Sequence, residues 1–288
     1  MKRIIIVGCG DIALRVSRLL KTRYHLFGLV RRSDRFAQLR AAGFTPLPAD
    51  LDDRRSLHGL AGLADVVLHF APPPNQGEYD TRTRNLLAAL SRGSLPKRLI
   101  YISTSGVYGD CGGAHVSETY PLNAQTARAR RRVDAEQQIR RWAKRNHVNA
   151  SILRVPGIYA ADRLPLARLR AGTPAIAASE DGYTNHIHAD DLAHIVVAAL
   201  HHAKPNRVVH ASDDSELKMG EYFDAVADAH GLPRPPRLPR AEVERSVSPA
   251  LWSFMNESRR LSNRRMKNEL KVQLQYPAVA DALASFGR

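Results

Sequence analysis

A glycine-rich turn near the N-terminus is the clearest candidate for chemistry in the sequence. A short apolar run leads into Gly8-Cys9-Gly10-Asp11-Ile12-Ala13, a G-x-G-x-x-A pattern at the start of a helical stretch. In such a turn Gly8 permits the tight bend, Gly10 lets the backbone approach a pyrophosphate, and the small Ala13 allows close helix–strand packing. The free N–H groups at Asp11 and Ile12, at the positive end of the helix dipole, favour an anion. We therefore predict a dinucleotide site that includes Gly8, Gly10, Asp11 and Ile12.

The end of the second predicted strand indicates which dinucleotide the site prefers. An NAD site usually has an acidic residue about 20 residues after the glycines, where it binds the ribose 2′-hydroxyl. This sequence has Arg31 and Arg32 at that point and no acid. Two guanidinium groups can grip a 2′-phosphate through charge-assisted bonds, so we predict NADP, with NAD as the alternative. Two solvated arginines in an arginine-rich chain are the other interpretation of the same pair.

Asp50 and Leu51 follow the third predicted strand. The carboxylate of Asp50 could accept a hydrogen bond from the adenine amino group. It could also cap the short helix that follows, and the two roles are compatible.

The order of predicted elements explains how these residues come together. Strands alternate with helices, which indicates a parallel sheet with right-handed crossovers and hence an α/β doubly wound Rossmann fold. After about residue 156 prolines interrupt the pattern, and we expect a smaller C-terminal substrate lobe. The predicted division is 1–155 with about 186–212 for the nucleotide-binding domain, and 156–185 with 213–288 for the lobe. The expected strands are 2–7, 25–30, 44–47, 65–70, 97–102, 149–155 and 207–211; the expected helices are 11–20, 35–42, 81–91, 126–146, 164–170, 190–201 and 221–230, with two more after the proline-rich turn.

Composition narrows the class of protein. The 288 residues include 43 Lys and Arg against 28 Asp and Glu, a net charge of +15, with 44% hydrophobic residues. These values are typical of a globular protein and exclude a disordered or collagen-like chain. The positive charge favours anionic partners, but no recognisable nucleic-acid module accompanies it, so nucleic acid is not the expected partner. No apolar run is long enough to span a bilayer, and Cys9 and Cys111 have no metal-ligand spacing, so we expect a reduced, cytoplasmic protein.

Several further segments complete a family resemblance that covers most of the chain. They are His69-Phe70-Ala71-Pro72, Ser103-Thr104-Ser105-Gly106-Val107-Tyr108-Gly109, Leu153-Arg154-Val155-Pro156-Gly157-Ile158-Tyr159 and Asn185-His186-Ile187-His188-Ala189-Asp190-Asp191. With the glycine turn, they make the sequence similar to the extended short-chain dehydrogenase/reductase superfamily, in its NAD-dependent epimerase/dehydratase branch. The resemblance implies a catalytic hydroxyl at Thr104, with Ser103 beside it. It also implies cofactor contacts from Phe70, Ala71 and Pro72 and from Pro156, Gly157 and Ile158.

The helix at 126–146 departs from that family. The resemblance implies a Tyr-x-x-x-Lys pair there, with tyrosine as the acid/base, yet this helix has no tyrosine. Its two possible registers place either Thr126 and Arg130 or Arg128 and Arg132 at the pair, and we select Arg130 as a cofactor contact. Neither threonine nor arginine can accept a proton as a tyrosinate does near neutral pH. The proton could instead pass through Tyr108, Tyr159, His186 or His188, which the sequence does not rank.

Other clusters of polar residues give weaker evidence of a functional site. His186 and His188 with Asp190 and Asp191 have the spacing of metal ligands, but the resemblance places them at a strand-to-helix junction, with Asp190 or Asp191 as the expected helix cap, so we predict no metal. The serines around Thr104 lack the G-x-S-x-G elbow of a hydrolase. The resemblance places the C-terminal lobe against the substrate, where Arg259 or Arg260 could meet an anionic group or simply belong to a solvated helix.

These observations predict an NADP-dependent oxidoreductase or epimerase-like enzyme acting on a small molecule. A nucleotide sugar is the substrate that the family implies, and another anionic metabolite is the alternative. The missing tyrosine supports a second hypothesis, a non-catalytic NADP-binding sensor or regulator. The sequence gives no prediction of oligomeric state.

Overall fold

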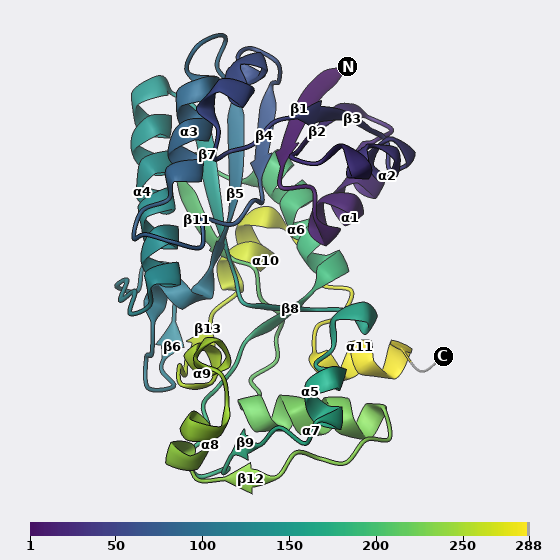
Figure 1. The fold of residues 1–288 in the computed structure, drawn as a ribbon, viewed down its shortest axis with the longest axis vertical. Helices are drawn as coiled ribbons and strands as arrows, with labels where there is room; N and C mark the ends of the chain where they lie inside the picture. Colours follow the sequence, from purple (N-terminus) through teal and green to yellow (C-terminus); the bar gives the residue numbers. More distant parts are fainter. Residues whose placement is uncertain (287–288) are drawn as a thin grey trace.

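The structure is a computed structural model that describes residues 1–286. Its centre is a seven-stranded parallel sheet in the order β11-β7-β5-β4-β1-β2-β3, the arrangement of a Rossmann fold (Figure 1). Strand order reverses between β1 and β4, so the chain winds outward in both directions from that point. The strands are β1 (Lys2–Val7), β2 (Tyr24–Val30), β3 (Phe44–Pro48), β4 (Val66–His69), β5 (Arg98–Thr104), β7 (Asn149–Val155) and β11 (Arg207–His210).

Burial on both faces explains why these segments form the sheet. Ile4, Ile5, Ile6 and Val7 of β1 have no exposed surface at all. Their side chains alternate between two separate hydrophobic cores, with Ile4 and Ile6 in one and Ile5 and Val7 in the other. A continuous apolar run of this kind is typical of a parallel strand covered by helices on both sides.

Helices cover the two faces, as the alternating pattern predicts. Figure 1 shows α3 and α4 along one side of the sheet and α1 with α6 along the other. Leu86, Ile139 and Trp142 of the first pair belong to one core, whereas Val16 and Leu192 of the second pair belong to the other. The bounds are α1 (Asp11–Leu20), α2 (Phe36–Ala41), α3 (Thr81–Leu90), α4 (Ala127–Asn146), α6 (Ala189–His202) and α10 (Arg264–Leu270), with short 3-10 helices η1 (Ser33–Arg35), η2 (Arg54–Leu60), η3 (Ser105–Tyr108) and η4 (Ala161–Arg163).

Smaller elements lie below the carboxyl edge of the sheet in Figure 1. They include three two-stranded parallel ladders, β8 with β10, β9 with β12, and β6 with β13. A separate hydrophobic core, which includes Leu169, Phe223 and Val279, holds several of the helices together. The strands are β6 (His115–Val116), β8 (Gly157–Tyr159), β9 (Ala175–Ile176), β10 (His186–His188), β12 (Arg237–Leu238) and β13 (Arg260–Leu261); the helices are α5 (Leu166–Arg170), α7 (Met219–Ala229), α8 (Arg240–Ser246), α9 (Pro249–Met255) and α11 (Val279–Phe286).

Two local predictions are wrong. Four helices (α8 to α11), rather than two, follow the proline-rich turn. The N-cap of α6 is His188, whose Nδ1 accepts a hydrogen bond from the backbone N–H of Asp190, and neither Asp190 nor Asp191. The carboxylate of Asp191 instead accepts hydrogen bonds from the backbone N–H groups of Gln275 and Tyr276, which attaches the C-terminal segment to the sheet.

Among the helices of residues 1–286, none combines the length and hydrophobicity that crossing a bilayer requires.

Candidate functional site

The turn between β1 and α1 has the geometry that an anion site needs. Gly8 has φ +95°, and a Cβ added there would lie 2.5 Å from the backbone nitrogen of Ala71, so only glycine fits. Gly10 has no atom within 4 Å of its Cβ position, so the space above the turn is open. Gly10 is also the N-cap of α1 and supplies no side-chain cap. The first backbone N–H groups of α1 are therefore available to a phosphate placed in that open space.

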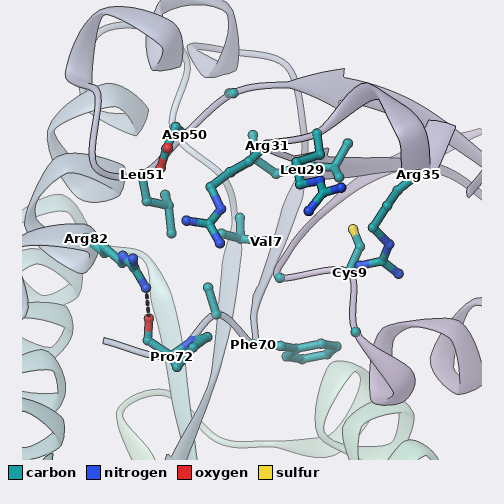
Figure 2. Close-up of a pocket in the computed structure, with 16 residues that line it drawn as sticks. Val7, Cys9, Leu29, Arg31, Arg35, Asp50, Leu51, Phe70, Pro72 and Arg82 are labelled. Atoms are coloured by element: carbon teal, nitrogen blue, oxygen red, sulfur yellow. Dashed lines mark hydrogen bonds between the residues drawn. The ribbon is translucent and has the colours of Figure 1, made fainter. Parts of the chain in front are cut away.

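A first cavity, of about 340 Å³, lies over this turn (Figure 2). Its walls come from the carboxyl ends of β1, β2, β3 and β4, on both sides of the point where strand order reverses. This is where open α/β sheets bind their ligands. The cavity brings together most of the predicted cofactor residues, namely Gly8, Gly10, Arg31, Arg32, Asp50, Leu51, Phe70, Ala71 and Pro72.

The two predicted arginines lie differently. In Figure 2 the guanidinium of Arg31 projects into the cavity, toward Leu51 and Val7. Within residues 1–286 the guanidinium of Arg31 forms no hydrogen bond or ion pair, and its charge acts on Asp52 only as a minor contribution to the lowered pKa of that carboxyl, which Arg82 already binds. Arg32 is largely exposed and pairs with Asp34. Of the two, Arg31 is therefore the cation whose donors are available to a ligand in the cavity.

Two further arginines line the same cavity and were not predicted. Arg35 extends from η1, close to Cys9. Arg82 of α3 pairs with Asp52 at 2.6 Å and donates to the carbonyl oxygen of Pro72 at 3.3 Å. The R-R-S-D-R run holds a signal for Arg35 in its repeated arginines. Arg82 has no local signal, because it meets the cavity only through tertiary packing.

Other predicted residues near the turn have structural contacts. Asp11 forms ion pairs with Arg15 at 3.0 Å and Arg163 at 3.1 Å, and Ile12 packs in the core. Neither is among the residues that line the cavity. The cap of η2 is Asp53, which accepts from the N–H of Arg55, and this corrects the interpretation of Asp50 as that cap. The Asp50 carboxylate accepts from the N–H of Asp52 at 3.0 Å and stays at the cavity wall.

A second cavity, of about 390 Å³, lies further along the carboxyl edge, beyond β5 and β7. Several residues that the sequence analysis named line it: Thr104 at the end of β5, Pro156 to Ile158 at the start of β8, and also Thr126, Arg128, His186 and Arg259. The sequence did not assign the other polar and aromatic residues of its wall to a site, among them Arg163, Tyr183, Phe254 and Glu257. They come from the smaller elements, which close this cavity from the side opposite the sheet.

The two hydroxyl candidates separate at this cavity. Thr104 lines it, and its Oγ1 accepts a hydrogen bond from the N–H of Gly106 at 3.2 Å, which caps η3 and fixes the side chain. Ser103 points the other way. It is buried, and its Oγ donates to Oε1 of Glu136 at 2.6 Å. The structure therefore places only Thr104 where its hydroxyl can meet a ligand.

Helix α4, with its N-cap, puts the first member of each expected pair at the cavity and leaves the second member outside it. Thr126 and Arg128 line it. Arg130 pairs with Glu78 at 3.0 Å and lines neither cavity, so the choice of Arg130 over Arg128 is not reflected in the packing. Arg132 donates to the hydroxyl of Tyr101 and to the carbonyl oxygen of Ile102. Neither two-residue register presents both of its members to the cavity.

Only one of the four candidates for proton transfer lines the second cavity. Tyr108 is buried against Arg154 and His210, and burial raises its pKa to about 12. Tyr159 is buried, and that burial raises its pKa further still. His188 caps α6. His186 lines the cavity, and its burial lowers its pKa to about 3, so the ring is neutral at neutral pH.

The histidine pair packs against aromatic rings. His186 stacks on Tyr222 with ring centroids 4.1 Å apart, and His188 lies against Tyr276 at 4.2 Å. Over residues 1–286 there is no group of three or more His, Cys, Asp or Glu side chains that could hold a metal ion. Arg259 lines the second cavity, whereas Arg260 lies over the ring of Tyr183.

Comparisons with known proteins agree with this fold. A solved structure of a functionally unknown conserved protein from Silicibacter pomeroyi DSS matches with a TM-score of 0.82 and 27% identity, over 100% of this chain and 98% of that one. UDP-glucuronic acid 4-epimerase from Bacillus cereus, in complex with NAD, matches at 0.77 and 19% over 98% and 96%. Human epimerase family protein SDR39U1 with NADPH matches at 0.73 and 17% over 99% and 98%. At these low identities the last two show the fold alone.

A family model described as "NAD dependent epimerase/dehydratase family" matches residues 13–211, which is more than half of the sequence. The chain therefore belongs to the NAD-dependent epimerase/dehydratase family.

Proposed function

We propose that this protein is an NADP-dependent oxidoreductase or epimerase-like enzyme. The observation that carries the proposal is the unpaired guanidinium of Arg31 in a cavity that opens over the glycine turn. A family member with a carboxylate at that position would favour NAD, because a carboxylate accepts from the ribose 2′-hydroxyl and repels a 2′-phosphate. An arginine without a counter-ion reverses this preference.

The residues present fit such a dinucleotide. The turn at Gly8 and Gly10 and the first N–H groups of α1 would hold the pyrophosphate. Arg31, with Arg32 and Arg35 beside it, would hold the 2′-phosphate. Asp50 and Leu51 would bound the adenine, Phe70 to Pro72 would line the path between the cavities, and Pro156 to Ile158 would lie against the nicotinamide. When bound, the dinucleotide would supply hydride transfer to or from a carbon that bears an oxygen.

The second cavity would hold the substrate. Thr104 is the group placed to hydrogen-bond the reacting oxygen, because its side chain is fixed by Gly106 and still lines the cavity. Ser103 would act as a positioning residue through Glu136. Among the candidates for proton transfer His186 is the one in reach, as a neutral imidazole. The substrate is an anionic small molecule, for which the Bacillus cereus neighbour, a UDP-glucuronic acid 4-epimerase, offers a nucleotide sugar as precedent.

Paired variants of the two neighbouring arginines test the cofactor assignment. Arg31→Gln should weaken NADPH binding by about tenfold to a hundredfold, the loss of one or two charge-assisted hydrogen bonds, and should leave NADH binding unchanged. Arg32→Gln is the matched control, because Arg32 is solvated and paired with Asp34, and we expect a smaller change. Equal effects of the two variants, or an equal loss of NADH binding, would contradict the role of Arg31.

The absence of tyrosine from α4 favours a second candidate, a non-catalytic NADP-binding regulator. A screen of carbonyl substrates with NADPH, run on the wild type and on Thr104→Ala, distinguishes the two functions. An enzyme should lose turnover while NADPH affinity persists. A regulator should show no turnover in the wild type and no change in the variant.

Three further expectations belong to this proposal. We expect residues 1–155 with about 186–212 to form the nucleotide-binding domain and residues 156–185 with 213–288 to form the substrate lobe, with the exception of α10, whose Met266 and Leu270 pack in the core of the sheet. The cysteines Cys9 and Cys111 are both free thiols, which fits a reducing, cytoplasmic location. NAD remains the alternative cofactor.

A further inference from the structure

The second cavity has more positive than negative charge on its wall. Arg128, Arg163 and Arg259 line it, and Glu257 is the single carboxylate among the lining residues that the structure describes. Arg163 has a counter-ion in Asp11 at 3.1 Å, and Arg259 has one in Glu257 at 2.7 Å. Arg128 is the lining arginine that forms no ion pair with a described residue.

No protein acceptor holds Arg128. In the described part of the chain its guanidinium forms no hydrogen bond or ion pair. Its terminal carbon lies 4.5 Å from the ring centroid of Phe254, so the aromatic face orients the group without accepting from its N–H donors. Desolvation at the cavity wall, together with the charges of Arg132 and Arg131, lowers the pKa of Arg128, while the charge of Glu257 acts in the opposite direction. Arg128 is exposed as a residue, so its guanidinium donors have no protein acceptor and meet solvent at the cavity wall, where an anionic ligand can replace the water.

A second arginine of this wall has a buried donor without a partner. Arg259 donates through Nη1 to the carbonyl oxygen of Gly109 and to Glu257, both at 2.7 Å. Its Nε is buried and has no hydrogen-bond partner. Two lining arginines therefore have donors that the described residues do not use, on the cavity that also holds Thr104.

We propose that Arg128, supported by Arg259, binds an anionic group of the substrate, a carboxylate or a phosphate. This rests on the proposed function for the presence of a substrate in the cavity. The cavity of about 390 Å³ is near the small end of the range for ligand sites, and it must also admit the nicotinamide end of the dinucleotide. The substrate is accordingly a small anionic carbonyl or hydroxyl compound, rather than a nucleotide sugar. In the register that places Arg128 and Arg132 at the family's pair, the residue at the tyrosine position would serve recognition of charge.

The test is calorimetric titration of the NADPH-loaded protein with inorganic phosphate and, separately, with acetate. Saturating NADPH keeps these anions out of the first cavity. The wild type should bind at least one of them saturably, and Arg128→Gln should weaken that binding about tenfold or more. Arg128→Lys, which keeps the charge but loses the planar fork, should fall between the two. Arg130→Gln is the matched control on the same helix, and it should bind as the wild type does.

Several outcomes would overturn the proposal. Among them are the absence of saturable binding of either anion by the wild type, and equal losses in Arg128→Gln and Arg130→Gln. Arg128 could instead bind a phosphate of the cofactor, and a separate NADPH titration of each variant tests this alternative. If Arg128→Gln loses NADPH affinity by the same factor, Arg128 serves the cofactor and the proposal is wrong. If the wild type binds no NADPH, the proposed function fails, while the comparison of variants in nucleotide-free protein still decides the role of Arg128.

Discussion

Arg154 and Glu136 form a buried ion pair directly behind the strand that carries Thr104. Nη2 of Arg154 lies 2.7 Å from Oε2 of Glu136, and the side chains are 4% and 2% exposed. The same carboxylate accepts from Ser103 Oγ, and Arg154 also donates to the hydroxyl of Tyr108 at 2.6 Å. The pair thus joins α4, β5, β7 and η3, the four elements that set the position of Thr104. Its effect on the site is to make that position rigid.

Breaking this pair should be costly. Glu136→Gln leaves the Arg154 guanidinium buried without a counter-ion, so we expect a loss of about 3–5 kcal/mol in the free energy of unfolding. Urea denaturation followed by circular dichroism measures it. The exposed pair of Asp228 and Arg234 supplies the control, and Asp228→Asn should leave the urea midpoint unchanged. A loss below about 1 kcal/mol for Glu136→Gln would show that water reaches the pair.

Asp213 should make stability depend on pH. Burial raises the pKa of Asp213 to about 8, whereas in the unfolded chain it is about 3.9. Between these values the folded protein holds a proton that the unfolded chain has lost, so this group lowers stability as pH rises from about 4 to 8. Asp213→Asn cannot ionise and should lack that contribution. Urea unfolding at pH 5 and pH 8 checks it: the variant should gain stability over the wild type on going to pH 8. An unchanged difference would mean that Asp213 ionises freely.

Alanine substitution should affect folding stability at Gly8 and nucleotide affinity at Gly10. Gly8→Ala forces a left-handed backbone and a contact of 2.5 Å with Ala71, so we expect a loss of at least about 2 kcal/mol of folding stability. Gly10→Ala has an ordinary φ of −84° and open space around the new methyl group, so it should fold as stably as the wild type. That methyl group occupies the approach to the turn, and NADPH affinity should fall. Thermal melting with NADPH titration separates the effects. Unaltered NADPH binding by Gly10→Ala would place the phosphates elsewhere.

Local sequence patterns predicted the sheet well, for a physical reason. A strand buried on both faces has to be continuously apolar, and β1 and β7 occur within the bounds expected for them. The glycine turn was recognisable because its backbone needs determine residue types at fixed spacing, as the φ of Gly8 illustrates. Residues close together in the sequence determine both features.

Contacts between distant segments could not be predicted in the same way. Arg82 forms an ion pair with Asp52, which lies far from it in the sequence. Asp191 likewise accepts hydrogen bonds from Gln275 and Tyr276. Glu257 lines the same cavity as Thr104. No periodicity or motif in the sequence predicts such long-range contacts. The N-cap of α6 was missed for a related reason, because tertiary bonds engage the carboxylate of Asp191 and leave the cap to His188. The second cavity, built largely from such contacts, was accordingly the less predictable half of the site.

Fluorescence titration of the wild-type protein with NADPH and with NADH tests the central claim most directly. The unpaired Arg31 guanidinium at the first cavity predicts saturable binding of both, with NADPH at least about tenfold tighter. Equal affinities would contradict the preference for the 2′-phosphate and leave the dinucleotide site standing. No binding of either nucleotide would contradict the site itself, and the proposed activity with it.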